Sequence, residues 1–276
     1  PAVCIMIPTY NQASFITKAV ESALAQDYPN TIIVVADDCS SDETQAVLAN
    51  YIQSDKIRYH RNVTNIGRVA NYSYCLYQLA ETDWVINLDG DDYFTNNHFI
   101  SAAIEAIQQE GEQQVLFYQG VNILKSGKKE TPLFSKIKSE REMFTGIGYF
   151  LNFFRIKSFS HMSTVYNRPK ALQSGFYKKD AISADIFSFL NMCLQFDTDK
   201  VIISNTIAGV WVQHNNNISK NYNPKTHIQN LKLFKILYRI AINKGLNKLK
   251  CSKWLLAAHY YYLRILAGKY LQLLKK

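Results

Sequence analysis

The C-terminal part of this chain contains no acidic residue. All 22 Asp and Glu of the 276-residue sequence lie at or before Asp199, together with 17 of the 31 Lys and Arg. The segment from Lys200 to Lys276 holds the other 14 basic residues, so a chain of net charge +9 has an acidic first part and a strongly basic end. A basic segment attracts anionic surfaces. The acidic first part argues against nucleic acid as the partner.

The sequence also lacks paired cysteines, internal repeats and low-complexity tracts. Its five cysteines are odd in number, and no two have the spacing of a metal or redox site. The first residues, Ala2–Ile7, form an apolar strand-like run without the basic leader of a secretory signal. We therefore expect reduced thiols, most of them buried, in a cytoplasmic protein.

The first hundred residues alternate between strand-like and helix-like patterns, in a chain long enough for one large domain. Strands are expected at Ala2–Ile7 (ended by Pro8), Thr31–Ala36, Lys56–His60 and Trp84–Leu88. Helices are expected at Ala13–Gln26, after Ser41–Thr44 and at Gly67–Ala80. This order predicts an α/β fold with a doubly wound, mostly parallel sheet flanked by helices.

The pattern is less regular after this point. A helix at Asn96–Gln109 and a strand at Val115–Gln119 are followed by Val121–Phe134, which fits either a hairpin or a mobile loop. Met143–Phe154 is expected to be partly helical. Further strands are expected at Met162–Tyr166, Val201–Ser204 and Gly209–Gln213. Further helices are expected from Pro169 to Gly175, at Ala184–Phe196 and from Thr226 onward, with a break around Lys244–Lys250.

An acidic loop follows the fourth expected strand. The run Val85–Asp92 delivers three carboxylates, those of Asp89, Asp91 and Asp92, at the end of a buried strand. Like charges this close raise each other's pKa unless a positive charge is present. A divalent cation such as Mn²⁺ or Mg²⁺, with phosphate oxygens, would neutralise them. A solvated turn is the alternative, because Asp and Gly are common in turns.

A second acidic pair ends the second expected strand. Because parallel strands end at the same edge, Asp37-Asp38 should lie near the acidic loop. Open α/β sheets bind their ligands at this edge. Two such clusters favour a metal–nucleotide site over two chance turns.

The chain resembles the family 2 glycosyltransferases with a GT-A fold, from about Ala2 to Ser219. Five motifs in the correct order carry the resemblance: Ile5–Asn11, Val34–Asp42, Asn65–Arg68 with Asn71, the D-x-D-like Leu88–Asp92, and His214–Ser219. Cys39 stands where this family more often has glycine or asparagine. The resemblance implies a catalytic domain over residues 1–219, followed by a basic amphipathic helical extension over residues 220–276.

The resemblance implies a nucleotide-sugar donor at the strand ends. Pro8, Thr9 and Tyr10 would frame the base and ribose. Asp38 would accept the imide N–H of uracil or of thymine, although capping the next segment is an alternative role. Arg68 would pair with the diphosphate or brace the acidic loop, unless it is a surface arginine. The donor site would also include Asp89 and Gly90.

The resemblance also implies a separate role for each carboxylate of the acidic loop. Asp91 would bind the metal, Asp89 would contact the ribose or a metal-bound water, and Asp92 would shape the turn. His214 would reach the metal or the diphosphate, with an exposed histidine as the alternative.

Asp185 lies where the family carries the base that takes the acceptor's proton. Ala184 stands where the family more often has Glu, and Asp180 is the competing candidate. An Asp near a helix N-terminus also stabilises that helix without any catalytic role.

These features predict an inverting, metal-dependent, non-processive glycosyltransferase. The chain has neither a Gln-x-x-Arg-Trp motif nor a bundle of spanning helices, both expected of processive synthases. The expected reaction moves a sugar, hexose or N-acetylhexosamine, from a UDP-sugar to a hydroxyl of a bacterial surface glycan or glycolipid. Alternatives are a sugar nucleotidyltransferase, although Pro8–Gln12 is not its glycine- and arginine-rich loop, and a non-catalytic protein that binds donor, nucleic acid or membrane.

The basic tail has two helical faces in its first part. Leu231, Phe234, Leu237, Tyr238 and Ala241 fall on one face, and Lys232, Lys235 and Arg239 on the other. Trp254–Leu274 is more apolar, with Trp254, Tyr260, Tyr261, Tyr262 and Tyr270 as candidate interface aromatics. Arg264 near its centre argues against a membrane span. Peripheral binding to the anionic inner face of the cytoplasmic membrane, and a helical subdomain that forms a homodimer, both remain open.

Overall fold

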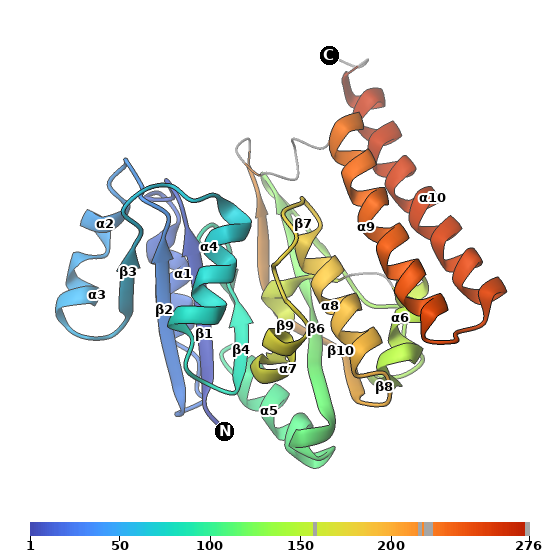
Figure 1. The fold of residues 1–276 in the computed structure, drawn as a ribbon. Coiled ribbons are helices and arrows are strands. Elements are labelled where there is room, and N and C mark those ends of the chain that lie inside the picture. Colours follow the sequence, from blue (N-terminus) through green and yellow to red (C-terminus); the bar gives the residue numbers. More distant parts are fainter. Residues whose placement is uncertain (157–158, 215–216, 218–222, 274–276) are drawn as a thin grey trace.

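One ten-stranded sheet runs through the protein, as seen in a computed structural model that describes residues 1–156, 159–214, 217 and 223–273 (Figure 1). The main strand order is β3-β2-β1-β4-β9-β6-β10-β5, with β7 beside β6 and β8 beside β10. The first four strands in the chain are parallel, as predicted: β1 Val3–Thr9, β2 Thr31–Asp37, β3 Arg58–Arg61 and β4 Trp84–Asn87. Every residue of β1 is buried, which explains its unbroken apolar run. The strand continues through Pro8 to Thr9, two residues beyond its predicted end.

The second half of the sheet is mixed. Strand β9 (Thr164–Asn167) lies antiparallel between β4 and β6 (Val115–Ser126), and β10 (Lys200–Gln213) runs parallel to β6. Strand β5 (Tyr93–Phe94) pairs antiparallel with β10. The prediction of two short strands in place of β10 was wrong, because register shifts absorb the polar residues between its apolar halves without ending the strand.

Two further pairings extend the sheet. Strand β7 (Lys129–Pro132) folds back on β6 through Gly127, whose φ of 61° suits a tight turn. The Val121–Phe134 segment is therefore a hairpin. Strand β8 (Arg141–Thr145) pairs with β10, so the segment predicted as partly helical begins as a strand.

Helices cover both faces of the sheet, and each face has its own apolar core. Helices α1 and α5 pack on one face, and α4, α6, α8, α9 and α10 contribute to the core on the other. The helix bounds are α1 Ile16–Leu24, α2 Thr44–Val47, α3 Ala49–Gln53, α4 Arg68–Tyr74 with a π-helical turn over Cys75–Leu79, α5 Phe99–Gln109, α6 Gly146–Ile156, α7 Arg168–Gln173 and α8 Ala184–Gln195. Short 3₁₀ turns lie at Glu112–Gln114 and His161–Ser163.

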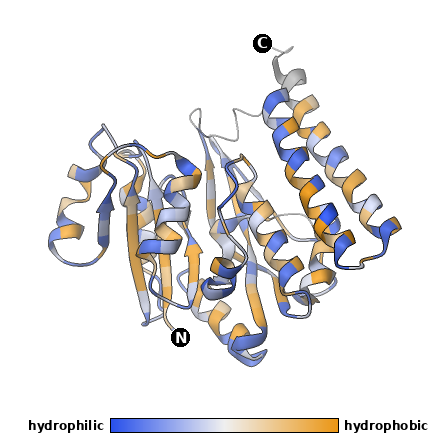
Figure 2. Ribbon diagram, viewed as in Figure 1, coloured by the Kyte–Doolittle hydropathy of each residue, from blue (hydrophilic) through white to orange (hydrophobic). Residues whose placement is uncertain are grey.

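The basic tail forms an antiparallel helical pair, α9 (Pro224–Asn243) and α10 (Lys248–Leu273). Both helices carry hydrophobic and hydrophilic residues along their length (Figure 2). Phe234 of α9 and Trp254 of α10 are buried in the same core as α6 and α8, and the Trp254 ring stacks on Phe150 with centroids 4.3 Å apart. The predicted basic face is exposed, at Lys232, Lys235 and Arg239. None of the helices in the described part of the chain has the length and apolar composition of a membrane span.

Candidate active site

A cleft of about 750 Å³ opens at the carboxyl ends of β1, β2 and β4. Among its lining residues are all the predicted site residues except Gly90: Pro8, Thr9, Tyr10, Asp38, Arg68, Asp89, Asp91, Asp185 and His214. These residues come from segments up to about two hundred positions apart in the sequence. The structure therefore brings the predicted donor, metal and base positions together in one cleft.

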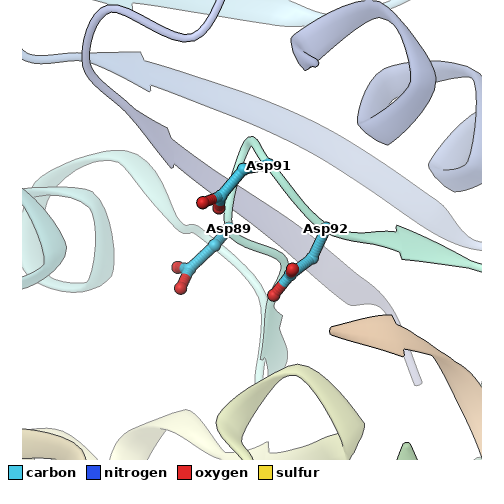
Figure 3. A group of neighbouring side chains, drawn as sticks. All are labelled: Asp89, Asp91 and Asp92. Carbon is cyan, nitrogen blue, oxygen red and sulfur yellow. The ribbon is translucent and has the colours of Figure 1, made fainter. Parts of the chain in front are cut away.

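The acidic loop forms one wall of this cleft. The carboxylates of Asp89, Asp91 and Asp92 point to the same side of the loop after β4 (Figure 3), and one oxygen of each lies within 4.8 Å of the others. Burial and the charge of Asp89 raise the pKa of Asp91. Burial and the neighbouring carboxylates raise the pKa of Asp92 well above its ordinary value. Crowded, poorly solvated carboxylates are a donor set that fits a hard divalent cation.

Asp92 is also held by the protein backbone. Its Oδ1 accepts a hydrogen bond of 2.8 Å from the amide of Val212, which ties the acidic loop to β10. The turn-shaping role of Asp92 stays a prediction.

Asp89 differs from its neighbours because two side chains partner it. The Tyr72 hydroxyl donates to Oδ1 at 2.5 Å, and His161 Nε2 lies 3.1 Å from Oδ2. Burial alone would raise the pKa of Asp89, but His161, Tyr72 and Arg68 outweigh it and hold this pKa below its ordinary value. Asp89 is therefore the member of the loop that stays ionised most readily.

His214 reaches the acidic loop from the end of β10. Its Nε2 lies 2.7 Å from Asp91 Oδ2, and its ring stacks on Phe15 with centroids 4.7 Å apart. Asn217 Nδ2 donates to the same carboxylate oxygen at 3.2 Å. The rest of the predicted closing loop, residues 215–216 and 218–219, lies outside the described residues.

Asp38 holds the loop of residues 62–67 in place. Its carboxylate accepts hydrogen bonds from the backbone amides of Ile66 and Gly67, both at 2.8 Å, and from Asn62 Nδ2 at 2.9 Å. An ionised carboxylate has about four acceptor positions, so these bonds leave one for another donor. The neighbouring Asp37 is fully buried and bonded to Ser40 and Tyr59, which makes it structural.

The loops after β1 and β4 pack tightly against each other through Gly90. A Cβ atom at Gly90 would lie 2.5 Å from Gln12 Oε1 and 2.8 Å from Thr9 Oγ1, so a larger residue would force these side chains to move. The Thr9 hydroxyl in turn donates to Gln12 at 2.7 Å. Gly90 thus permits this close approach, and the cleft surface is formed by its neighbours.

Arg68 contacts the segment that leads into α8. Its Nη2 donates to the carbonyl oxygens of Ala181 and Ile182, at 3.0 and 3.2 Å, and its guanidinium lies 5.5 Å from the centre of the Tyr72 ring. Arg68 is therefore not an unattached surface arginine, and it fixes the backbone just before Asp185.

Asp185 lies in the first turn of α8 and lines the cleft, with its side chain 21% exposed. The competing Asp180 lines a separate surface hollow with Gly67 and Lys178. Of the two candidates, Asp185 therefore lines the cleft and Asp180 does not.

His161 connects the two acidic positions, and the sequence analysis missed it. Its Nε2 contacts Asp89, and its Nδ1 lies 3.8 Å from Asp185 Oδ2. Burial lowers the pKa of His161, but the two carboxylates outweigh burial and the pKa is raised. No motif marks a single histidine before a strand, so only the fold places it between Asp89 and Asp185.

A model of the protein family described as Glycosyl transferase family 2 matches residues 4–173, more than half of the chain. The chain belongs to this family. The predicted fold and the predicted enzyme family are confirmed: the chain is a member of a glycosyltransferase family and has the GT-A fold.

Among curated relatives, the chain is similar to the poly(ribitol-phosphate) beta-N-acetylglucosaminyltransferase TarS of Staphylococcus aureus (strain Mu50 / ATCC 700699), with 29% identity over 43% of this chain and 21% of TarS. It is also similar to an uncharacterized glycosyltransferase of Rickettsia bellii (strain RML369-C), with 33% identity over 46% of this chain and 18% of that protein. The chain thus spans about a fifth of the length of these relatives.

Solved structures show the same fold at low sequence identity. The S. aureus TarS 1-349 structure in complex with UDP-GlcNAc matches with a TM-score of 0.74 and 17% identity, over 92% of this chain and 70% of that one. The mannosyltransferase PcManGT from Pyrobaculum calidifontis, in complex with GDP-Man and Mn²⁺, matches with a TM-score of 0.60 and 15% identity, over 98% and 74%.

Proposed function

We propose that this glycosyltransferase moves a sugar from a UDP-sugar to an acceptor hydroxyl, with inversion and with the help of a divalent cation. The observation that carries the proposal is the placement of Asp89, Asp91 and Asp185 in a single cleft at the strand ends. Complexes of the structurally similar TarS with UDP and with UDP-GlcNAc support the choice of nucleotide and an N-acetylhexosamine as the sugar. The acceptor class that we propose is a bacterial surface glycan or glycolipid, as the family resemblance implies.

The donor would lie between the loop after β1 and the acidic loop. Pro8 and Tyr10 line this side of the cleft, and the remaining acceptor position of Asp38 suits the imide N–H of uracil. Asp91, Asp89 and His214 would hold Mn²⁺ or Mg²⁺, in keeping with the Mn²⁺ in the PcManGT structure. The cation, when bound, neutralises the charge that builds up on the departing diphosphate.

The acceptor would react on the side of Asp185. As the acceptor oxygen attacks the anomeric carbon, the Asp185 carboxylate takes the hydroxyl proton. The bond from that carbon to the diphosphate oxygen breaks, and its electron pair leaves with UDP. One displacement of this kind inverts the anomeric centre.

The exposed face of α10 is a candidate site for peripheral attachment to an anionic membrane. Leu249, Leu256, Tyr260 and Leu263 are 52–68% exposed and recur at helical spacing, with Lys253 and Arg264 among them. An amphipathic helix with apolar and basic residues binds the headgroup region of anionic bilayers. The enzyme would then work at the cytoplasmic face of the membrane. A homodimer through the same face is the competing proposal.

A thermal-shift panel tests the donor and metal proposals together. We expect UDP and UDP-GlcNAc to raise the unfolding temperature, GDP to raise it less, and Mn²⁺ to increase the UDP shift. Asp91→Asn should remove the Mn²⁺-dependent part of the shift, while Asp27→Asn, a change on the surface away from the cleft, should keep it. Absence of any UDP shift in the wild-type protein would contradict the proposal.

A further inference from the structure

Helix α10 supplies one wall of the active-site cleft. Tyr261, Tyr262 and Ile265 line the cleft beside Phe159 and Ile186, although they lie far from every motif of the catalytic domain in the sequence. The basic tail is therefore part of the cleft as well as a neighbour of the core.

Two hydrogen bonds fix this wall relative to Asp185. The hydroxyls of Tyr262 and Ser183 lie 2.9 Å apart, and the amide of Ser183 donates to Asn230 Oδ1 of α9 at 3.4 Å. Ser183 precedes Asp185 by only two residues. The neighbouring Tyr261 ring packs against Tyr262, with centroids 5.1 Å apart, and so lies at a defined place on the Asp185 side of the cleft.

The two sides of the cleft differ in chemistry. The donor side is lined by carboxylates and amides, at Asp38, Asn65, Asn71, Asp89 and Asp91, beside the aromatic Tyr10, Phe15 and Tyr72. Around Asp185 five apolar or aromatic residues, Phe159, Ile182, Ile186, Tyr261 and Ile265, lie beside the polar Ser160, His161 and Ser183. The Ser183 hydroxyl on this side is already bonded to Tyr262.

In the proposed function the diphosphate lies between the acidic loop and the loop after β1, so the acceptor would approach from the side of Asp185. A hydroxyl-rich glycan chain needs polar partners for the groups that it buries. A hydrocarbon group needs none, and it gains about 25 cal/mol for each Å² of apolar surface removed from water.

We propose that the apolar wall formed by Phe159, Ile182, Ile186, Tyr261 and Ile265 is the acceptor subsite, and that it takes an amphiphilic acceptor with a hydrocarbon group beside the hydroxyl that is glycosylated. The inference rests on the proposed function, because Asp185 as base defines which side is the acceptor side.

Binding of two glucosides that differ only in their aglycone tests this inference. Octyl β-D-glucopyranoside, kept below its micelle-forming concentration, and methyl β-D-glucopyranoside are titrated into the protein loaded with UDP and Mn²⁺. The octyl glucoside should bind at least tenfold more tightly. Tyr261→Ala should reduce this preference at least fivefold, and Ile265→Ser should reduce it as well.

Tyr260→Ala is the matched control, because Tyr260 is 65% exposed on the outer face of the same helix. It should leave the preference unchanged. Equal affinity for the two glucosides would overturn the inference, and so would equal losses in Tyr260→Ala and Tyr261→Ala, which would indicate adsorption to the outer face. The UDP-induced thermal shift is recorded for every variant, so failure of the donor proposal is seen separately.

Discussion

At the scale of single residues, the cleft is built from side chains that hold loops as well as from those that face a ligand. Asp38 does both, because three donors from residues 62–67 occupy most of the hydrogen-bond acceptor positions of its carboxylate. The sequence predicted its position at a strand end but not these partners, because they come from a loop more than twenty residues away. Replacing Asp38 would therefore disturb the loop and the nucleotide site together.

Cys39 offers a test of backbone strain beside the nucleotide loop. Its φ of 62° lies in the left-handed region, which explains why glycine or asparagine is more usual at this position. Cys39→Gly should stabilise the protein by about 1 kcal/mol, measured by urea unfolding, because glycine adopts this region without steric cost.

Cys39→Ala is the control for this change. Alanine removes the thiol but keeps the Cβ atom, so it should bring no gain in stability. A destabilised Cys39→Gly protein would show that the contact between the Cys39 thiol and the Val63 carbonyl matters more than the strain.

At the scale of elements, apolar runs predicted β1, β2 and β4 well because most residues of these strands are buried, whereas the edge strand β3 is partly exposed. The same reasoning split β10 into two strands, since a bulge inside one strand has the same sequence pattern as a loop between two. The sequence did not predict a role for His161, for a related reason. Its place between Asp89 and Asp185 depends on the antiparallel pairing of β9 with β4.

The link between α10 and α8 gives a prediction at this scale. Tyr262→Phe removes the hydroxyl that hydrogen-bonds with Ser183. Its loss should lower the free energy of unfolding by about 1 kcal/mol. If this contact positions Asp185, the kcat for hydrolysis of UDP-GlcNAc, measured as UDP release, should fall about tenfold, with the KM for UDP-GlcNAc unchanged.

Two further variants separate positioning from general destabilisation. Tyr260→Phe changes the same residue type on the exposed face and should leave kcat unchanged. Ser183→Ala should reproduce the loss, and the double variant with Tyr262→Phe should be no slower than either single variant. Additive losses would contradict a shared contact.

The apolar and basic residues on the outer face of α10 predict binding to anionic membranes. The protein should sediment with vesicles that contain phosphatidylglycerol and remain in solution with vesicles of phosphatidylcholine alone, because each basic residue near an anionic surface contributes about 1 kcal/mol. Leu256→Asp should weaken sedimentation at least tenfold, whereas Leu24→Asp, on α1, should not. The homodimer would be favoured instead if the wild-type protein does not bind vesicles but dimerises with increasing concentration, and if Leu256→Asp abolishes this dimerisation.

At the scale of the whole molecule, the acidic and basic parts of the sequence meet in one cleft. The acids at the strand ends belong to the proposed donor side, and α10 of the acid-free tail lines the cleft beside residues of the first part near Asp185. The sequence predicted both segments, but their contact could not be predicted, because it depends on the packing of Phe234 and Trp254 into the core of α6 and α8. The tail is thus continuous with the catalytic core, while its status as a separate domain stays a prediction.

The most direct test of the central claim is the rate of UDP release from UDP-GlcNAc and Mn²⁺ by Asp185→Asn. Water can replace the acceptor in this assay, so no acceptor has to be known. If Asp185 takes the proton of the attacking hydroxyl, kcat should fall about 10²- to 10⁴-fold, with the UDP-induced thermal shift preserved. A rate close to that of the wild-type protein would contradict the account.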